Sequence, residues 1–173
     1  MQSLYRRYPV GSLLVWVTQT ETMNTRGSGE LSAGTVKLLL DGQQRITSLY
    51  GIIRGEAPPF FDGNEDAFRN LYFNVANETF AFYMPTRMRH DPLWISVSRL
   101  MAEGIAPFVG AFSASDEYRE QMNTFVNRLN AVVGIRDVDL HIEEVTGADK
   151  TVDVVVDIFN RVNSGGTQLS KGD

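Results

Sequence analysis

Residues 35–54 read TVKLLLDGQQRITSLYGIIR, which is an apolar run, a turn and a helical pattern in direct succession. The run at 35–40 has the composition of a buried strand, and Asp-Gly is a common turn signal. Apolar side chains at 46, 49, 50 and 53 fall on one face of a helix that we expect to end near Arg54, with this stripe facing the core. The stretch therefore predicts a strand that passes through a sharp turn, the DGQQR turn (residues 41–45), directly into a helix.

The DGQQR turn is the place in the chain where structure and chemistry coincide. The first amides of a helix have no partner within the helix, and with the helix dipole they favour an anion such as phosphate. Arg45 lies off the apolar stripe, so we expect its guanidinium to point outward to a ligand. Asp41 would lie beside the same site, where a carboxylate can bind Mg²⁺ or accept a proton. Two alternatives stay open: a plain structural turn, and an Arg45 that pairs with Asp41 or Glu56.

The composition excludes several other kinds of site. The chain has no cysteine, which excludes disulfides, thiol catalysis and cysteine-ligated metals, and its two histidines leave no His-rich metal site. The net charge of −5 argues against a domain that holds nucleic acid by bulk electrostatics. A local basic patch lies at residues 87–90, where Arg87 and Arg89 are possible DNA contacts; the alternative is an ordinary solvated surface.

Length and hydropathy place the chain among cytoplasmic globular proteins. A chain of 173 residues predicts one domain with a sizeable core. The apolar runs are too short to span a bilayer, and the start of the chain does not resemble a signal peptide. We therefore expect a cytoplasmic location and no membrane partner.

Outside the DGQQR turn, strand and helix patterns alternate. Strands are predicted at 12–18, 71–75, 79–83 and 138–142, and the middle pair reads as a hairpin. Helices are predicted at 2–7, 115–133 and 151–162, with Ser113 or Ser115 as a cap for the second. A strand end followed by a short helix is expected at 93–101, and loops at 20–34 and 55–66. This order predicts an α+β fold, a small mixed sheet with helices packed on it.

Three motifs occur in a fixed order along nearly the whole chain. They are RYPVGSLLVW at 7–16, DGQQRITSL at 41–49 and IFNRVNSGGTQLS at 158–170. Together they resemble the N-terminal domain of GmrS/GmrD-type (GmrSD) restriction proteins, a bacterial family related to the ParB and sulfiredoxin fold. The resemblance implies one domain over residues 1–173 with a ParB/sulfiredoxin-like core. It also implies that this domain is cut at both ends from a longer protein whose C-terminal region carries an HNH-type nuclease.

The resemblance also implies an activity, which is hydrolysis of a nucleoside triphosphate (GTP, ATP or CTP) with Mg²⁺ in an anti-phage system that restricts modified DNA. The family motifs fall on Asp41, Gly42, Gln43, Gln44 and Arg45, and on Phe159, Asn163, Gly166, Leu169 and Asp173. On this hypothesis Asp41 positions Mg²⁺ or the attacking water, and the two glutamines bond phosphate or that water. Arg45 neutralises phosphate charge. The remaining nucleotide contacts would come from Gly42, Thr47, Asn163 and Gly166.

Two other functions stay open. The domain could be a ParB-like module that binds and nicks DNA itself, or a non-catalytic sensor of nucleotide or modified DNA. In all three cases we expect DNA to be engaged through the full-length protein.

Overall fold

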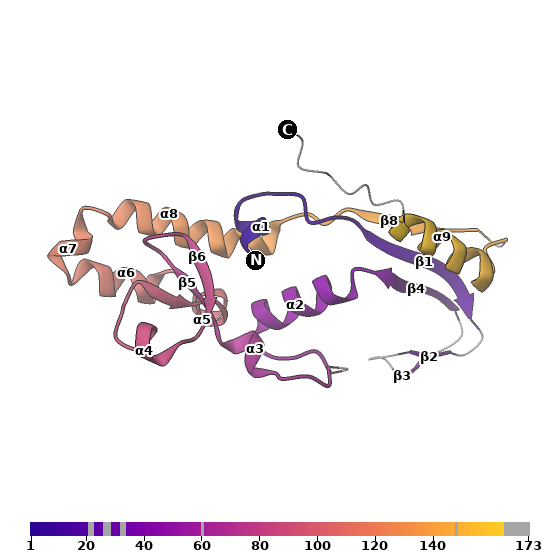
Figure 1. The fold of residues 1–173 in the computed structure, drawn as a ribbon, viewed down its shortest axis with the longest axis horizontal. Coiled ribbons are helices and arrows are strands. Elements are labelled where there is room, and N and C mark those ends of the chain that lie inside the picture. The colour runs from indigo at the N-terminus through magenta and orange to yellow at the C-terminus, as the bar shows by residue number, and fades with distance from the viewer. Residues whose placement is uncertain (21–22, 26–28, 32–33, 60, 148, 165–173) are drawn as a thin grey trace. The chain divides into compact units, whose positions relative to one another are not determined.

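The computed structural model describes residues 1–20, 23–25, 29–31, 34–59, 61–147 and 149–164. It divides into two compact units (Figure 1). Unit 1 comprises Met1–Val10 and Gln44–Asp139, and unit 2 comprises Gly11–Gln43 and Leu140–Asp173. Each unit combines a small sheet with helices, so the predicted α+β class is confirmed. Within the described residues, no helix is both long and apolar enough to cross a membrane.

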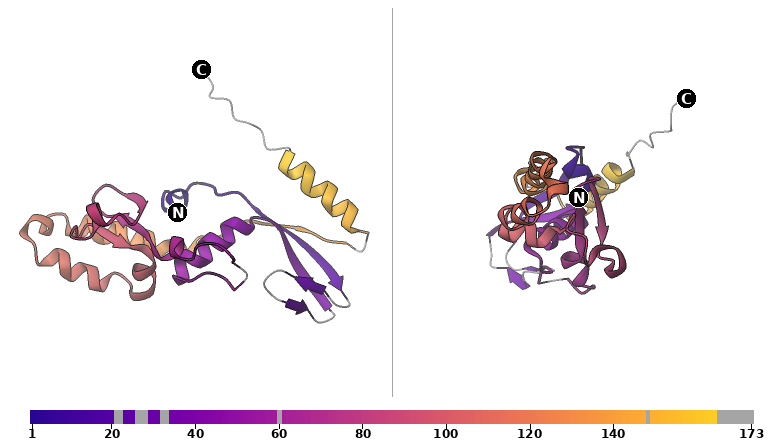
Figure 2. Two further views of the ribbon diagram at one scale, coloured as in Figure 1. Left: turned by 60° about the horizontal axis from the view of Figure 1, so that its bottom comes forward. Right: turned by 90° about the vertical axis from the view of Figure 1, so that its left-hand side faces the viewer.

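Unit 2 is built on a three-stranded mixed sheet of order β4-β1-β8. Strand β1 (Leu13–Thr20) pairs antiparallel with β4 (Gly34–Asp41) and parallel with β8 (Ile142–Val145). In Figure 2, β1 and β4 appear as a long twisted ribbon. The predicted strands at 12–18 and 35–40 and the mixed character of the sheet are confirmed.

Helix α9 (Val152–Ser164) covers this sheet. Val155 is buried with Leu14 and Trp16, and Ile158 and Phe159 pack against the same cluster. The predicted helix is therefore confirmed, with three of its four stripe residues facing the core. Val162, the fourth, is exposed.

Two predictions in unit 2 are wrong. Residues 20–34 were expected to form a loop, but β2 (Met23–Thr25) and β3 (Gly29–Leu31) pair antiparallel within them. Backbone groups that every residue carries make this pairing, so a polar composition does not prevent it. The strand expected at 138–142 begins instead at Ile142, because its register is set by pairing with Leu13–Trp16 of β1 rather than by its own alternation.

Unit 1 contains an antiparallel sheet of order β6-β5-β7. Its strands are β5 (Leu71–Asn74), β6 (Thr79–Phe82) and β7 (Trp94–Ser96), which confirms the predicted hairpin. One face of the sheet carries Leu71, Phe73 and Ile95 and is buried in the core of the unit. Besides the helix at Gln43–Arg54, the other elements of this unit are α1 (Gln2–Tyr5), α3 (Asp66–Arg69), α4 (Pro85–Met88), α5 (Val97–Glu103), α6 (Ala106–Ser113), α7 (Asp116–Arg119), α8 (Met122–Val133) and the 3-10 turn η1 (Gly134–Asp137).

The long helix predicted at 115–133 is two helices, α7 and α8. The helix is interrupted at Gln121. The amide of Gln121 donates to the carbonyl of Tyr118 (3.1 Å), which closes a tighter turn than that of an α-helix. Ser115 occupies the cap position of α7, but its side chain accepts no capping hydrogen bond. The predicted apolar stripe nevertheless forms, since Phe125, Leu129 and Val132 are buried.

Helix α2 (Gln43–Arg54) confirms the helix predicted after the DGQQR turn, but its buried face differs from the predicted stripe. Leu49 and Ile52 pack against the core, whereas Tyr50 is 38% exposed. The one fully buried position of the helix is Gly51, which lies against the ring of Phe68. The close approach of the Phe68 ring to Gly51 therefore gives α2 a buried face different from the predicted apolar stripe.

Gly51→Ala is expected to destabilise the protein by up to about 2 kcal/mol. Alanine gains about 1 kcal/mol of helix propensity, but its Cβ would lie 2.2 Å from Cδ1 of Phe68. The Phe68 ring is buried and packs on Phe61 (ring centroids 4.9 Å apart), so it has little room to move, and overpacking typically costs about 1–3 kcal/mol. Chemical denaturation measures the change in the free energy of unfolding.

Gly110→Ala in α6 is the matched control for this change. Nothing lies within 4 Å of the Cβ that alanine would add there. The control should therefore stabilise by about 0.5–1 kcal/mol through propensity alone. Equal stabilisation by both substitutions would contradict the close packing of Gly51 on Phe68.

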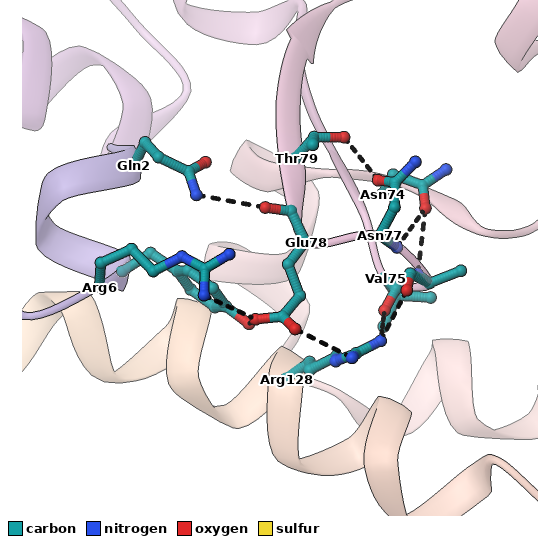
Figure 3. A network of polar contacts seen from close by, with 10 residues as sticks. Gln2, Arg6, Asn74, Val75, Asn77, Glu78, Thr79 and Arg128 are labelled. Carbon is teal, nitrogen blue, oxygen red and sulfur yellow. Dashed lines mark hydrogen bonds and ion pairs between the residues drawn. The ribbon is translucent and has the colours of Figure 1, made fainter.

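A polar network around Glu78 ties α1 and α8 to the turn between β5 and β6 (Figure 3). The carboxylate of Glu78 accepts the hydroxyl of Tyr5 (2.8 Å) and pairs with Arg128 (2.9 Å) and Arg6 (3.6 Å). Arg128 also donates to the carbonyls of Val75 (2.9 Å) and Ala76 (2.8 Å). One side chain in the turn therefore holds two distant helices.

Candidate nucleotide site at the DGQQR turn

The DGQQR turn has the predicted strand-to-helix geometry. Asp41 is the last residue of β4, Gly42 links the elements, and Gln43 is the first residue of α2. Gly42 is buried and has a φ of +93°, a conformation that favours glycine over residues with a side chain. The abrupt change of direction therefore depends on this glycine.

A β-bulge precedes the turn. Asp41 pairs with Leu14 of β1, and the next pair is Val15 with Leu39, so Leu40 is an extra residue in β4. Bulges bend a strand and re-aim its side chains, and they are frequent beside functional sites. The half-buried carboxylate of Asp41 is thus placed by an irregularity in the sheet as well as by the turn.

The side chain of Gln43 ties the start of α2 back to β4. Its Nε2 donates to the carbonyl of Leu39 (3.1 Å), and the residue is otherwise exposed. Gln44 is also exposed, and Thr47 is half-buried in the next turn of the helix. Both glutamines therefore present amide groups at the surface beside the turn.

Arg45 does not point outward as predicted. It is half-buried, and its Nη1 donates to the backbone carbonyl of Val10 (2.9 Å), just before β1. A guanidinium carries five N–H donors, so it can satisfy a carbonyl outside regular structure and keep its charge. This bond joins the first two of the three sequence motifs, and it fixes the position of the arginine.

The sequence profile of the GmrSD restriction endonuclease N-terminal domain matches residues 1–173, which include all three motifs and both units. The chain belongs to this family. No curated protein matches the chain.

The third motif of this GmrSD domain lies at the end of α9. Asn163 is exposed in the last turn of α9, and Phe159 packs against the core of unit 2. Gly166, Leu169 and Asp173 lie outside the described residues. The division between the units falls after Gln43, so Asp41, Gly42, Gln43 and Asn163 belong to unit 2, whereas Gln44, Arg45 and Thr47 belong to unit 1.

Within the described part of the chain, Asp41 does not belong to a ready-made cluster of metal ligands. Among the described residues, no group of three or more acidic or histidine side chains is close enough together to hold a metal ion. Mg²⁺ typically keeps several waters and binds through one or two carboxylates plus substrate phosphates. Asp41 suits this mode, in which the ion arrives with a nucleotide.

The two arginines of the predicted DNA patch lie in unit 1, away from the DGQQR motif in sequence. The guanidinium of Arg87, in α4, lies over the ring of Trp94 (5.2 Å from the ring centre). Arg89 and His90 follow α4 and line a pocket that also includes Trp94, Tyr72 and other residues of the sheet. Trp94 and Trp16 are both buried.

Sequence reasoning missed Tyr72, Tyr83 and Arg99 as lining residues of this pocket. The alternation of Leu71, Tyr72 and Phe73 was a usable signal, because it places a tyrosine on the face of β5 opposite the core. The position of Arg99 in the pocket lining could not be predicted from strand alternation, since it depends on how α5 follows β7.

Proposed function

We propose that the DGQQR turn binds a nucleoside triphosphate with Mg²⁺, and that the domain hydrolyses it as part of a restriction protein that acts on DNA. The observation that carries the proposal is the buried, positive-φ Gly42 between a bulged strand and the first turn of α2. Backbone amides at such a turn favour phosphate. Membership of a restriction endonuclease family supports the part of the proposal that places the domain in a restriction protein.

Each residue of the turn has a distinct role in this proposal. The amides that follow Gly42 cradle the phosphates, and Arg45, anchored on Val10, neutralises their charge. Asp41 would hold a Mg²⁺ ion that accompanies the nucleotide, or would orient the attacking water. The exposed amides of Gln43 and Gln44 bond to phosphate or to that water.

The remaining contacts to the nucleotide are assigned to residues further along the chain. Thr47 lies one turn beyond Gln43 on α2, and Asn163 and Gly166 are assigned to this role by the family resemblance of the third motif. GTP, ATP and CTP all offer the triphosphate that these groups would recognise.

Isothermal titration calorimetry with GTP, ATP and CTP, each with and without Mg²⁺, tests the proposal through Asp41. The wild type should bind at least one nucleotide saturably and more tightly with Mg²⁺. Asp41→Asn keeps the size of the side chain but removes the charge that attracts the ion, so its affinity should no longer respond to Mg²⁺. Asp62→Asn, an exposed carboxylate in the loop between α2 and α3, is the matched control. An equal response to Mg²⁺ in the wild type and Asp41→Asn would refute the assignment of the ion.

A further inference from the structure

We propose that the pocket on the outer face of the unit 1 sheet binds a single unstacked nucleotide, with aromatic side chains for the base and Arg89 for the phosphate. The pocket has a volume of about 590 Å³ and is lined by Tyr72, Tyr83, Arg89, His90, Trp94 and Arg99, among others. It lies within unit 1 and shares no residue with the DGQQR turn. The inference therefore stands independently of the proposed triphosphate site.

The aromatic side chains of the pocket, Tyr72, Tyr83 and Trp94, lie together partly because side chains alternate between the two faces of a strand. Tyr72 of β5 is opposite Ser96 of β7, and Asn74 is opposite Trp94, so Tyr72 and Trp94 share the face that points away from the core. Tyr83 follows β6 and packs on Tyr72, with ring centres 5.0 Å apart and ring planes inclined by 32°. Such rings can stack against any base, because every base has a π face.

The polar groups of the pocket suit a phosphate and a base edge. Arg89 is exposed and makes no ion pair with any described residue, whereas Arg99 pairs with Glu103 (2.9 Å) and lies over the ring of Phe108. Asp91 is the one acidic residue in the described lining, and its carboxylate already accepts the amide of Leu93 (2.9 Å).

Charge and tyrosine chemistry therefore favour an anionic ligand with a flat ring. Arg89 is left as a cation that a phosphate would neutralise, in a chain whose net charge is −5. Burial, with Tyr83 as a further cause, raises the pKa of Tyr72, so its hydroxyl stays protonated and can donate to a base.

The size of the pocket suits one nucleotide. Pockets that enclose small ligands typically have volumes of about 300–1,000 Å³, and the observed volume lies within this range. A stacked duplex cannot present a base to the rings, so DNA would have to offer a nucleotide that is unpaired or turned out of the helix. The same chemistry is shared by a free mononucleotide, and the experiment separates the two sources.

Trp94 provides a direct readout of this pocket. The chain has two tryptophans, and in a Trp16→Phe background the fluorescence of the indole comes from Trp94 alone. Trp16→Phe should be well tolerated, because the buried Trp16 Nε1 has no hydrogen-bond partner among the described residues. Titration with a single strand of twelve thymidines should quench Trp94 saturably. A blunt duplex should quench little, and a duplex with one bulged thymidine should restore the effect.

Arg89→Ala in this background should raise the dissociation constant about tenfold, the effect of losing one charge-assisted contact. Arg161→Ala removes the same charge from the exposed face of α9 and should leave binding unchanged. Both residues are exposed, and circular dichroism would verify that each variant is folded. The pocket shares no residue with the DGQQR turn, so failure of the triphosphate site cannot be confused with failure of this one.

The ligand source follows from a parallel titration with thymidine monophosphate. Binding of the strand at least about tenfold tighter than the mononucleotide would identify DNA, and equal affinities would identify a free nucleotide; both results support the site. Unchanged Trp94 emission with every ligand, or equal affinity of the wild type and Arg89→Ala, would overturn the proposal.

Discussion

Replacing Arg45 with alanine is expected to raise the dissociation constant for the nucleoside triphosphate by about 100-fold. A guanidinium-to-phosphate contact is charge-assisted and, in a half-buried position, is worth about 2–3 kcal/mol, and each 1.4 kcal/mol corresponds to a factor of ten. The bond to Val10 strengthens this expectation, because a side chain that is already fixed loses little entropy when the ligand binds. Calorimetric titration of the wild type and the variant measures the ratio directly.

Two further variants separate this binding role from a structural one. Arg45→Ala also loses the hydrogen bond to Val10, which should cost about 1 kcal/mol of stability, so the titration is made well below the melting temperature. Arg45→Lys keeps the charge without the planar fork and should recover only part of the affinity. Arg54→Ala, at the exposed end of the same helix, should bind as the wild type does. If Arg45→Ala folds and binds nucleotide with unchanged affinity, the role of Arg45 is structural and does not include nucleotide binding.

Glu78→Ala is expected to lower the free energy of unfolding by about 2 kcal/mol, a large effect for a single turn residue. The side chains of Glu78 and Arg128 are only 25% and 26% exposed, so removing the carboxylate leaves a half-buried guanidinium without its ion pair. The hydroxyl of Tyr5 loses its acceptor at the same time. Chemical denaturation gives the change, and Glu103→Ala is the control because its ion pair with Arg99 lies on an exposed helix face and should matter little. Equal effects of the two substitutions would contradict the role of the network.

The same network predicts an alkaline transition. Burial, together with the hydrogen bond to Glu78 and its charge, raises the pKa of Tyr5 to about 12 from an ordinary value of 10. Since this pKa is higher in the folded than in the unfolded protein, its contribution to stability is complete below about pH 10 and is lost as the pH rises towards 12. In Glu78→Gln the pKa of Tyr5 should fall, which a difference titration of tyrosinate absorbance against Tyr5→Phe would detect. An unchanged titration would show that Glu78 does not act on Tyr5.

The sequence pattern of a single element was sufficient to predict its structure where contacts within that element determine it. The strand, glycine turn and helix at residues 35–54 follow from composition and spacing, as does the core-facing stripe of α9. Prediction from the sequence pattern failed where contacts with residues distant in sequence determine the register of a strand or the buried face of a helix. The register of β8 depends on β1, and the buried face of α2 depends on the ring of Phe68.

The candidate site was predictable to a similar extent. The motif fixed the turn and its glycine, and the family match is consistent with the residues that carried the resemblance. The orientation of Arg45 was not predictable, because its partner is a backbone carbonyl 35 residues earlier, and a carbonyl carries no side-chain signal in the sequence. The pocket of unit 1 was predictable only in part. The basic residues could be identified in the sequence, but their proximity to Tyr72 and Tyr83 depends on how the strands pair in the sheet.

The most direct test of a nucleotide at the DGQQR turn is a titration of the ¹⁵N-labelled protein with GTP, ATP and CTP in the presence of Mg²⁺, followed by amide chemical shifts. With at least one nucleotide, the amides of Gly42, Gln43, Gln44 and Arg45 should shift saturably and more than any others in the assigned spectrum. These amides would lie against the phosphates, and their shifts should disappear in Arg45→Ala. Saturable shifts that leave this turn unchanged, or no saturable shifts with any of the three nucleotides, would contradict the proposed site.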